Sequence, residues 1–198
     1  MTENATMLRA FIAVNLPAEV RTPLETMLRR LKFPLAQAGI TWANPAQIHL
    51  TLKFLGDISA DSVGELTAAI RRGVAGVGPF TLHSAGLGMF PDDRKPRVVW
   101  AGVRGELPVL ARLQEQIERE TQAWRAAEHR EFRPHLTLGR VRHIRPAQAQ
   151  ILGAKVAEFR AADFGEWRVG QVDLMQSHLS ATGVTHTRLA EFPLDGCD

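Results

Sequence analysis

The sequence has little that would cross-link it or hold it in a membrane. It contains one cysteine, Cys197, near its end, so no disulfide can form within the chain. No apolar run approaches the ~20 residues that span a bilayer, and the first residues lack the basic and then apolar order of a secretory signal. These absences exclude disulfide-stapled and membrane-spanning classes, and we expect a cytoplasmic protein.

No segment rich in proline, glycine and serine divides the 198 residues. The length permits a substantial buried core, and 45% hydrophobic with 23% charged residues is ordinary for a globular protein. We therefore expect a single domain over 1–198, with a flexible tail at 1–7.

Acidic residues are absent from 132–157. The basic residues of this stretch are Arg133, Arg140, Arg142, Arg145 and Lys155. Such a stretch favours an anionic partner, such as phosphate or nucleic acid. On charge alone, however, a solvated surface is the simpler interpretation.

One tetrad of residues, His-Leu-Thr-Leu, occurs twice, at His49–Leu52 and at His135–Leu138. Each copy stands third in an order of strand, helix, tetrad strand, helix and strand. This order runs once over roughly 8–91 and again over roughly 96–194. The equivalent place of the two tetrads indicates a diverged internal duplication.

Apolar periodicity predicts the elements of this order. Strands are expected at 8–17, 48–56, 79–90, 97–103 and 132–141, with a closing pair at 167–179 and 184–194, and helices at 18–39, 59–76, 106–124 and 145–159.

Each tetrad has two different faces. Side chains alternate along a strand, so His49 and Thr51 point to one face and the leucines between and after them to the other. His135 and Thr137 repeat the pattern. The leucines would anchor each strand to the core. If a pseudo-two-fold axis relates the halves, the two polar faces meet across a cleft.

Two imidazoles facing one cleft suit acid–base displacement at phosphorus. With an ordinary pKa near 6.5, one ring can take a proton from the attacking oxygen while the other gives one to the leaving oxygen. The hydroxyls of Thr51 and Thr137 can donate to non-bridging phosphate oxygens. This scheme requires no metal or cofactor. A shared zinc site is the competing interpretation, and we favour it less because neither tetrad offers a carboxylate or second imidazole at suitable spacing.

A basic residue follows each tetrad. Lys53 alternates onto the face of the first histidine, where it could contact phosphate, although a solvated strand end is an equally good interpretation. Arg140 is out of phase with His135 unless Gly139 introduces a bulge, as glycine often does.

The tetrads and their flanking segments, LRAFIAVNLP, HLTLKFLG, PRVVWAGV, FRPHLTLGRV and LMQSHLSATG with LAEFPL, resemble the 2H phosphoesterase superfamily. Within it, the resemblance is to the bacterial and archaeal RNA 2′,3′-cyclic phosphodiesterases, also called 2′-5′ RNA ligases, and extends from about Leu8 to Leu194. It implies an α+β, bilobal, pseudo-two-fold fold, in which two antiparallel sheets line a central cleft, helices lie outside, and one lobe contains both termini.

The resemblance also implies roles for individual residues. His49 would be the proton donor, His135 the proton acceptor, Thr51 and Thr137 the phosphate-binding hydroxyls, and Arg140 the basic residue that often follows the second motif. The implied activity is hydrolysis of a terminal 2′,3′-cyclic phosphate of RNA to a 2′-phosphomonoester without a metal. We expect a monomer without an obligate protein partner.

Two alternatives stay open. The chain could be a 2H relative acting on 2′,5′-linked oligonucleotides or small cyclic nucleotides, with weak RNA ligase activity, or an RNA- or nucleotide-binding module without turnover. One departure from the family pattern is His186, which stands where a tyrosine is common, in a chain without any tyrosine. An exposed strand residue is the simpler interpretation of His186.

Overall fold

A computed structural model describes residues 6–126, 131–180 and 183–196. The strands of these residues are β1 (Met7–Asn15), β2 (Gly39–Trp42), β3 (His49–Ser59), β4 (Phe80–Phe90), β5 (Val98–Gly105), β6 (His135–His143), β7 (Asp163–Val169), β8 (Gln171–Ser180) and β9 (Gly183–Pro193). The α-helices are α1 (Ala18–Lys32), α2 (Val63–Val74), α3 (Leu107–Glu120) and α4 (Pro146–Glu158), and short 3-10 turns occur at Phe33–Leu35, Pro45–Gln47 and Ala60–Ser62.

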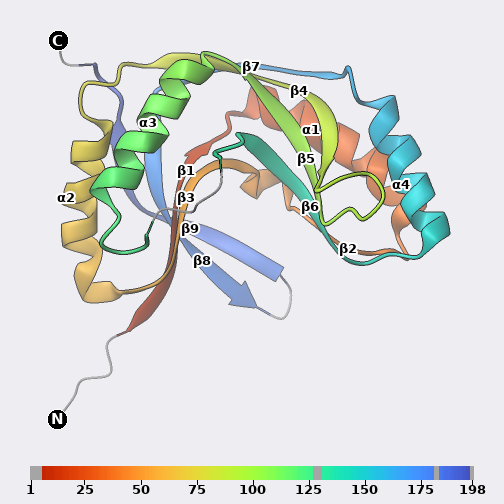
Figure 1. Ribbon diagram of the computed structural model, residues 1–198, viewed down its shortest axis with the longest axis horizontal. Coiled ribbons are helices and arrows are strands. Elements are labelled where there is room, and N and C mark those ends of the chain that lie inside the picture. The colour runs from red at the N-terminus through yellow and green to blue at the C-terminus, as the bar shows by residue number, and fades with distance from the viewer. Residues whose placement is uncertain (1–5, 127–130, 181–182, 197–198) are drawn as a thin grey trace.

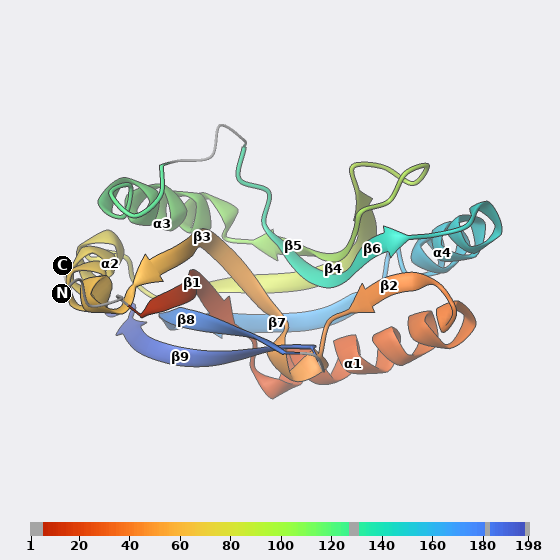
Figure 2. The same ribbon diagram turned by 90° about the horizontal axis from the view of Figure 1, so that it is seen from below.

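The strands form a curled antiparallel sheet in the order β7-β4-β5-β6-β3-β1-β8-β9, with β2 added beside β6. We call β3, β1, β8 and β9 with α2 and α3 the first lobe, and β6, β5, β4, β7 and β2 with α1 and α4 the second lobe. Figure 1 shows α2 and α3 on one side of the strands and α1 and α4 on the other, and Figure 2 shows the strands running between these two helix pairs. The α+β fold with antiparallel sheets and outer helices is confirmed.

β3 and β6 join the two lobes within the sheet. In the described residues their antiparallel pairing consists of one residue pair, Leu50 opposite Leu136. The expected pair of separate sheets is therefore one sheet that narrows to this contact. Both leucines are fully buried. The first lobe contains both β1 and β9, the first and last strands among the described residues, as Figure 1 shows.

The helices lie outside because each has one apolar stripe. In α1 the buried residues recur at helical spacing, and they are Val20, Leu24, Met27, Leu28 and Leu31. This helix packs on β7 and α4, whereas α2 and α3 pack on each other and α3 also on β3. Helix propensity alone seldom holds such short helices, so these apolar stripes provide most of their stabilisation.

Three segments differ from expectation. The strand expected at 167–179 is two strands separated at Gly170, because β7 pairs with β4 in the second lobe and β8 with β1 in the first. The sequence predicts a first helix that reaches residue 39, whereas α1 ends at Lys32 and Gly39 begins the short strand β2. Of the tail expected at 1–7, Met7 belongs to β1 and pairs with Ser59, and residues 1–5 lie outside the described residues.

Candidate functional site

The pairing of Leu50 with Leu136 aligns the two tetrads around one point. Because the strands are antiparallel, this register sets His49 opposite Thr137 and His135 opposite Thr51. All four polar side chains leave the strands on the face away from the buried leucines. We call His49, Thr51, His135 and Thr137 the polar quartet, in which the register aligns each histidine with the threonine of the other tetrad.

Both tetrad strands carry a bulge at the fourth residue of the tetrad. In β6 the pairing with β5 shifts between Thr137 and Gly139, so Leu138 is the extra residue. This bulge puts Arg140 on the same face of β6 as His135 and Thr137. It meets the condition under which the sequence predicted that Arg140 joins the site. Gly139 is packed too tightly for a side chain, since a Cβ there would lie 2.8 Å from Cε3 of Trp42.

The matching bulge in β3 has the opposite effect on Lys53. The pairing with β1 sets Thr51 opposite Ala13 but Lys53 opposite the buried Ile12. Lys53 is thereby turned toward α3, where its Nζ lies 2.7 Å from Oε1 of Glu118, and it is 6% exposed. The expectation that Lys53 shares the face of the first histidine does not hold, because strict alternation ends at the bulge.

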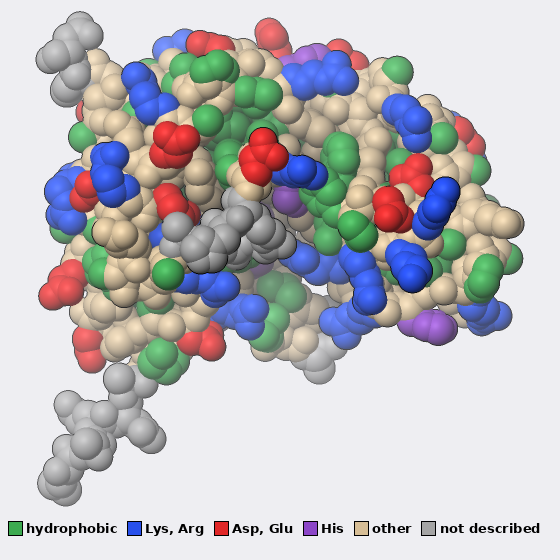
Figure 3. All heavy atoms as spheres, viewed as in Figure 1, with side chains coloured by type: hydrophobic (Ala, Val, Ile, Leu, Met, Phe, Trp, Pro, Cys, Tyr) green, Lys and Arg blue, Asp and Glu red, His purple; other side chains and the backbone are tan. Residues whose placement is uncertain are grey.

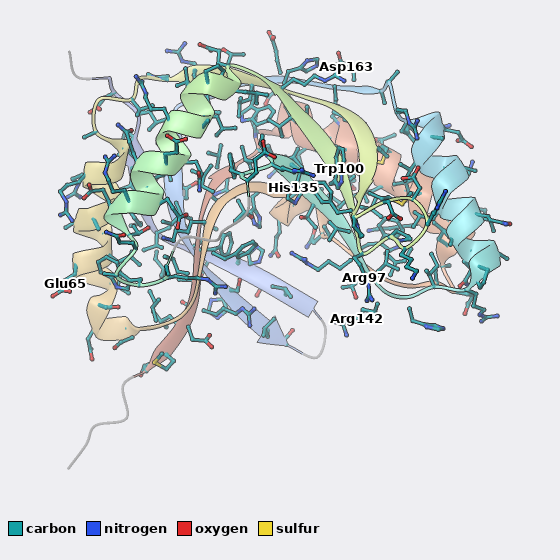
Figure 4. The ribbon with its side chains drawn as sticks, viewed as in Figure 1. Glu65, Arg97, Trp100, His135, Arg142 and Asp163 are labelled. Carbon is teal, nitrogen blue, oxygen red and sulfur yellow. The ribbon has the colours of Figure 1, made fainter. Side chains whose placement is uncertain are left out.

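A cleft of about 770 Å³ opens over this face. The predicted site residues among its lining residues are Thr51, Lys53, His135, Thr137 and Arg140, whereas His49 is not among them. Phe54, Phe90, Arg97, Phe132 and Arg133 also line it. In Figure 3 histidine side chains lie in the central hollow, and lysine and arginine side chains gather along its lower rim. Figure 4 shows His135 and Trp100 side by side at the middle of the molecule, with Arg97 and Arg142 at one end of the second lobe.

The two tetrad histidines are oriented in the same way. Nδ1 of His49 lies 2.8 Å from the carbonyl oxygen of Gln47, and Nδ1 of His135 lies 2.7 Å from that of Arg133. A carbonyl oxygen only accepts hydrogen bonds, so Nδ1 carries the hydrogen in each ring. Nε2 is then the nitrogen of each imidazole that is left to exchange a proton in the cleft.

Burial makes both rings harder to protonate. It lowers the pKa of His49 from 6.5 to about 4; the bond to Gln47 opposes this, and the charges of His186 and Arg140 add to it. Burial also lowers the pKa of His135, against the bond to Arg133 and with a contribution from Arg140. Without a ligand, both tetrad histidines are therefore neutral near neutral pH.

His186 is not the exposed strand residue that the sequence suggested. It is half-buried on β9, and its ring contacts those of His49 and Phe11 at centroid distances of 5.1 and 4.8 Å. Burial lowers the pKa of His186, and the charge of His178 adds to this. One feature of the sequence pointed to His186: it stands where the family commonly has a tyrosine. Its contact with His49 could not be predicted, because the alternation of one strand does not reveal contacts with a distant strand.

Within the described residues, no group of three or more His, Cys, Asp or Glu side chains is arranged to hold a metal ion. The donors that the cleft does offer are imidazoles, hydroxyls and guanidinium groups. In the same part of the chain, no helix is long and apolar enough to cross a membrane.

The chain is similar to known proteins over nearly its whole length. The family model described as "2′-5′ RNA ligase superfamily" matches residues 16–181. The RNA 2′,3′-cyclic phosphodiesterase of Methanothermobacter thermautotrophicus is 32% identical over 186 residues, which cover 94% of this chain and 98% of the relative. That of Aeropyrum pernix is 34% identical over 172 residues, covering 83% and 93%.

Solved structures show the same fold. The crystal structure of TT0787 of Thermus thermophilus superposes with a TM-score of 0.77 at 31% identity, over 96% of this chain and 99% of that one. The structure of E. coli LigT complexed with 3′-AMP gives a TM-score of 0.73 at 25% identity, with the same coverage.

The neutral state of His49 should be visible in the pH dependence of folding stability. The pKa is lower in the fold than in the unfolded chain, so the unfolded chain binds the proton first as pH falls below about 6.5. The stability contributed by neutral His49 is present above that pH and lost toward pH 4. At pH 4.5 the loss should be about 2–3 kcal/mol. Urea unfolding of wild type and His49→Gln at pH 7 and 4.5 measures it. An identical pH dependence of the two proteins would contradict this assignment.

The ion pair of Lys53 should behave as a buried one. Glu118→Gln leaves the ammonium without a counter-charge, so we expect the free energy of unfolding to fall by about 3 kcal/mol. Glu120→Gln is the matched control on the same helix, because Glu120 pairs with the largely exposed Arg72 and should change stability little. If urea unfolding gives equal losses for both variants, the pair does not hold Lys53 as described.

Proposed function

We propose that this chain, which belongs to the 2′-5′ RNA ligase superfamily of 2H phosphoesterases, hydrolyses a terminal 2′,3′-cyclic phosphate of RNA to a 2′-phosphomonoester. The observation that carries the proposal is the pairing of Leu50 with Leu136, which aligns the two tetrads beside a cleft lined by Thr51, His135 and Thr137. The full-length relatives named RNA 2′,3′-cyclic phosphodiesterase support it.

The charge of the cleft suits a phosphodiester of RNA. Arg97, Arg133 and Arg140 are among its lining residues. Arg140 also lies close enough to both tetrad histidines to lower their pKa values. An anionic phosphate between the two imidazoles offsets that positive charge, while the hydroxyls of Thr51 and Thr137 donate to its non-bridging oxygens. The E. coli relative was solved with 3′-AMP, a nucleotide with one phosphate group as a monoester.

In the proposed reaction, a water molecule attacks phosphorus opposite the ribose 3′ oxygen. Neutral His135 takes the proton of the water at Nε2 as the new P–O bond forms. The P–O3′ bond breaks, and protonated His49 gives its Nε2 proton to O3′, which leaves the phosphate on O2′. The reaction ends with His135 protonated and His49 neutral, so solvent must exchange both protons before the next turnover.

To act as the proton donor, His49 must be protonated when the P–O3′ bond breaks. Its pKa of about 4 in the empty site means that the ring is neutral when the substrate arrives near pH 7. A nearby anion raises the pKa of an imidazole. His49 therefore gains its proton together with the phosphate, whereas His135 must stay neutral to act as the base.

Removing either imidazole should abolish most turnover. His49→Ala and His135→Ala should each lower kcat by roughly 10²–10⁴, the usual contribution of one acid or base group. Thr51→Ala and Thr137→Ala should lose less, because a second hydroxyl remains. The assay uses a defined RNA oligomer with a cyclic-phosphate end, in EDTA, since imidazoles and hydroxyls complete the proposed site.

His83→Ala is the control for these variants. His83 is bonded to Asp163 at 2.8 Å, and Figure 4 shows Asp163 at the edge of the molecule, away from His135. We expect its turnover to match wild type. Near-wild-type turnover in a folded tetrad variant, or activity that requires added zinc or manganese, would overturn the proposed mechanism.

The position of the phosphate in the product tests which bond breaks. Phosphorus NMR of the reaction mixture distinguishes a 2′-phosphomonoester from a 3′-phosphomonoester, and we expect the 2′ product. A dominant 3′ product would mean that O2′ is the leaving oxygen and that the substrate lies in the cleft in the opposite sense.

A further inference from the structure

Three aromatic rings from three strands meet at the first-lobe side of the site. The rings of Phe11 and His49 are stacked, with centroids 4.7 Å apart and planes at 28°. The ring of His186 meets both of them edge to face, at 4.8 Å and 69° to Phe11 and at 5.1 Å and 77° to His49. Each ring thus contacts the other two, and we call Phe11, His49 and His186 the ring cluster.

The twist of one hairpin explains how His186 reaches a histidine on a non-adjacent strand. β8 pairs with β1 only as far as Gln176, whereas its pairing with β9 continues to Ser180. His186 lies opposite Ser177, the first residue of this two-stranded ribbon. Such ribbons twist more strongly than wide sheets, and Figure 1 shows the free end of β8 and β9 crossing the direction of β1 and β3.

The ring cluster breaks the symmetry of the two tetrads. His135, the counterpart of His49, has an edge contact with Phe90 at 5.1 Å and 87°. No second imidazole is found in ring contact with His135 among the described residues. The histidines of two identical tetrads therefore have different neighbours. His49 has a second imidazole, that of His186, in ring contact, whereas His135 has the phenyl ring of Phe90.

The charged and titratable groups around the two imidazoles of the ring cluster lie on β6, β8 and β9. Arg140 faces the cluster from β6, and His178 lies on β8. Arg188, two residues further along β9, is already in ion pairs with Asp173 and Glu191. The cluster has no carboxylate in contact with either imidazole among the described residues. A proton on one ring therefore opposes a proton on the other, as in any closely coupled pair.

We propose that His186 is a positioning residue for His49: its ring completes the packing that fixes the His49 imidazole, and its charge competes with the proton that His49 must carry as the donor. This inference rests on the proposed function for its catalytic consequence, whereas the contact between the rings does not. At pH values where His186 is neutral, its ring holds the His49 imidazole in place and does not oppose the positive charge of protonated His49. As pH falls and His186 takes up a proton, His49 is protonated less readily.

Four variants separate the two parts of this role. His186→Phe and His186→Tyr keep a ring but carry no positive charge, so the NMR titration midpoint of His49 should move up in both, with turnover retained. His186→Ala removes the ring and should lower kcat roughly 10–100-fold with little change in KM, because small displacements of a catalytic group have losses of this size. His83→Gln removes an imidazole that is hydrogen-bonded to Asp163 in the second lobe, and should leave the His49 midpoint and kcat near wild type.

The titration is carried out on the free protein, with the His49 signal assigned by its loss in His49→Gln. An unchanged His49 midpoint in both His186→Phe and His186→Tyr would overturn the charge competition, and a wild-type kcat in His186→Ala would overturn the positioning role. The titration result does not depend on the identity of the substrate, whereas the kcat result requires a substrate that the wild type turns over. Absence of cyclic-phosphate hydrolysis by the wild type would instead overturn the proposed function and leave the titration result standing.

Discussion

The contact between Leu50 and Leu136 is the constraint on which the site depends. The antiparallel register at this pair decides which hydroxyl lies beside which imidazole. Because side chains alternate along a strand, a shift of one residue would turn the polar quartet into the core and the leucines into the cleft. The complete burial of both leucines opposes such a shift, so the hydrophobic core fixes the position of the polar side chains next to them.

Much of the site could be predicted from the sequence because it depends on local alternation within a repeated motif. The opposite faces of histidine and leucine in each tetrad, and the repeated order of elements, follow from periodicities that a strand or helix imposes on its own residues. The position of Arg140 could be predicted only conditionally, since it required a bulge. That bulge is present at Leu138.

The failures share a different cause. The orientation of Lys53 depends on the register between β3 and β1, and the contact of His186 with His49 depends on the twist of a ribbon formed from β8 and β9. β2 has four residues, too few for a clear alternation. Each of these features is set by neighbouring strands, and a pattern read along one segment contains no information about them.

The exchange of elements between the two halves of the chain has a mechanical consequence. β4 comes from the first half of the sequence but lies between β5 and β7 of the second lobe, while β8 and β9 come from the second half and complete the first. α1 packs on the second lobe and α3 on the first, although each follows a strand of the opposite lobe. The walls of the cleft are therefore not two bodies on a hinge, and widening the cleft would strain several connections at once. Because several chain connections tie the two walls together, under the proposed function an RNA end would be selected by its fit to the gap between them rather than by closure of the walls around it.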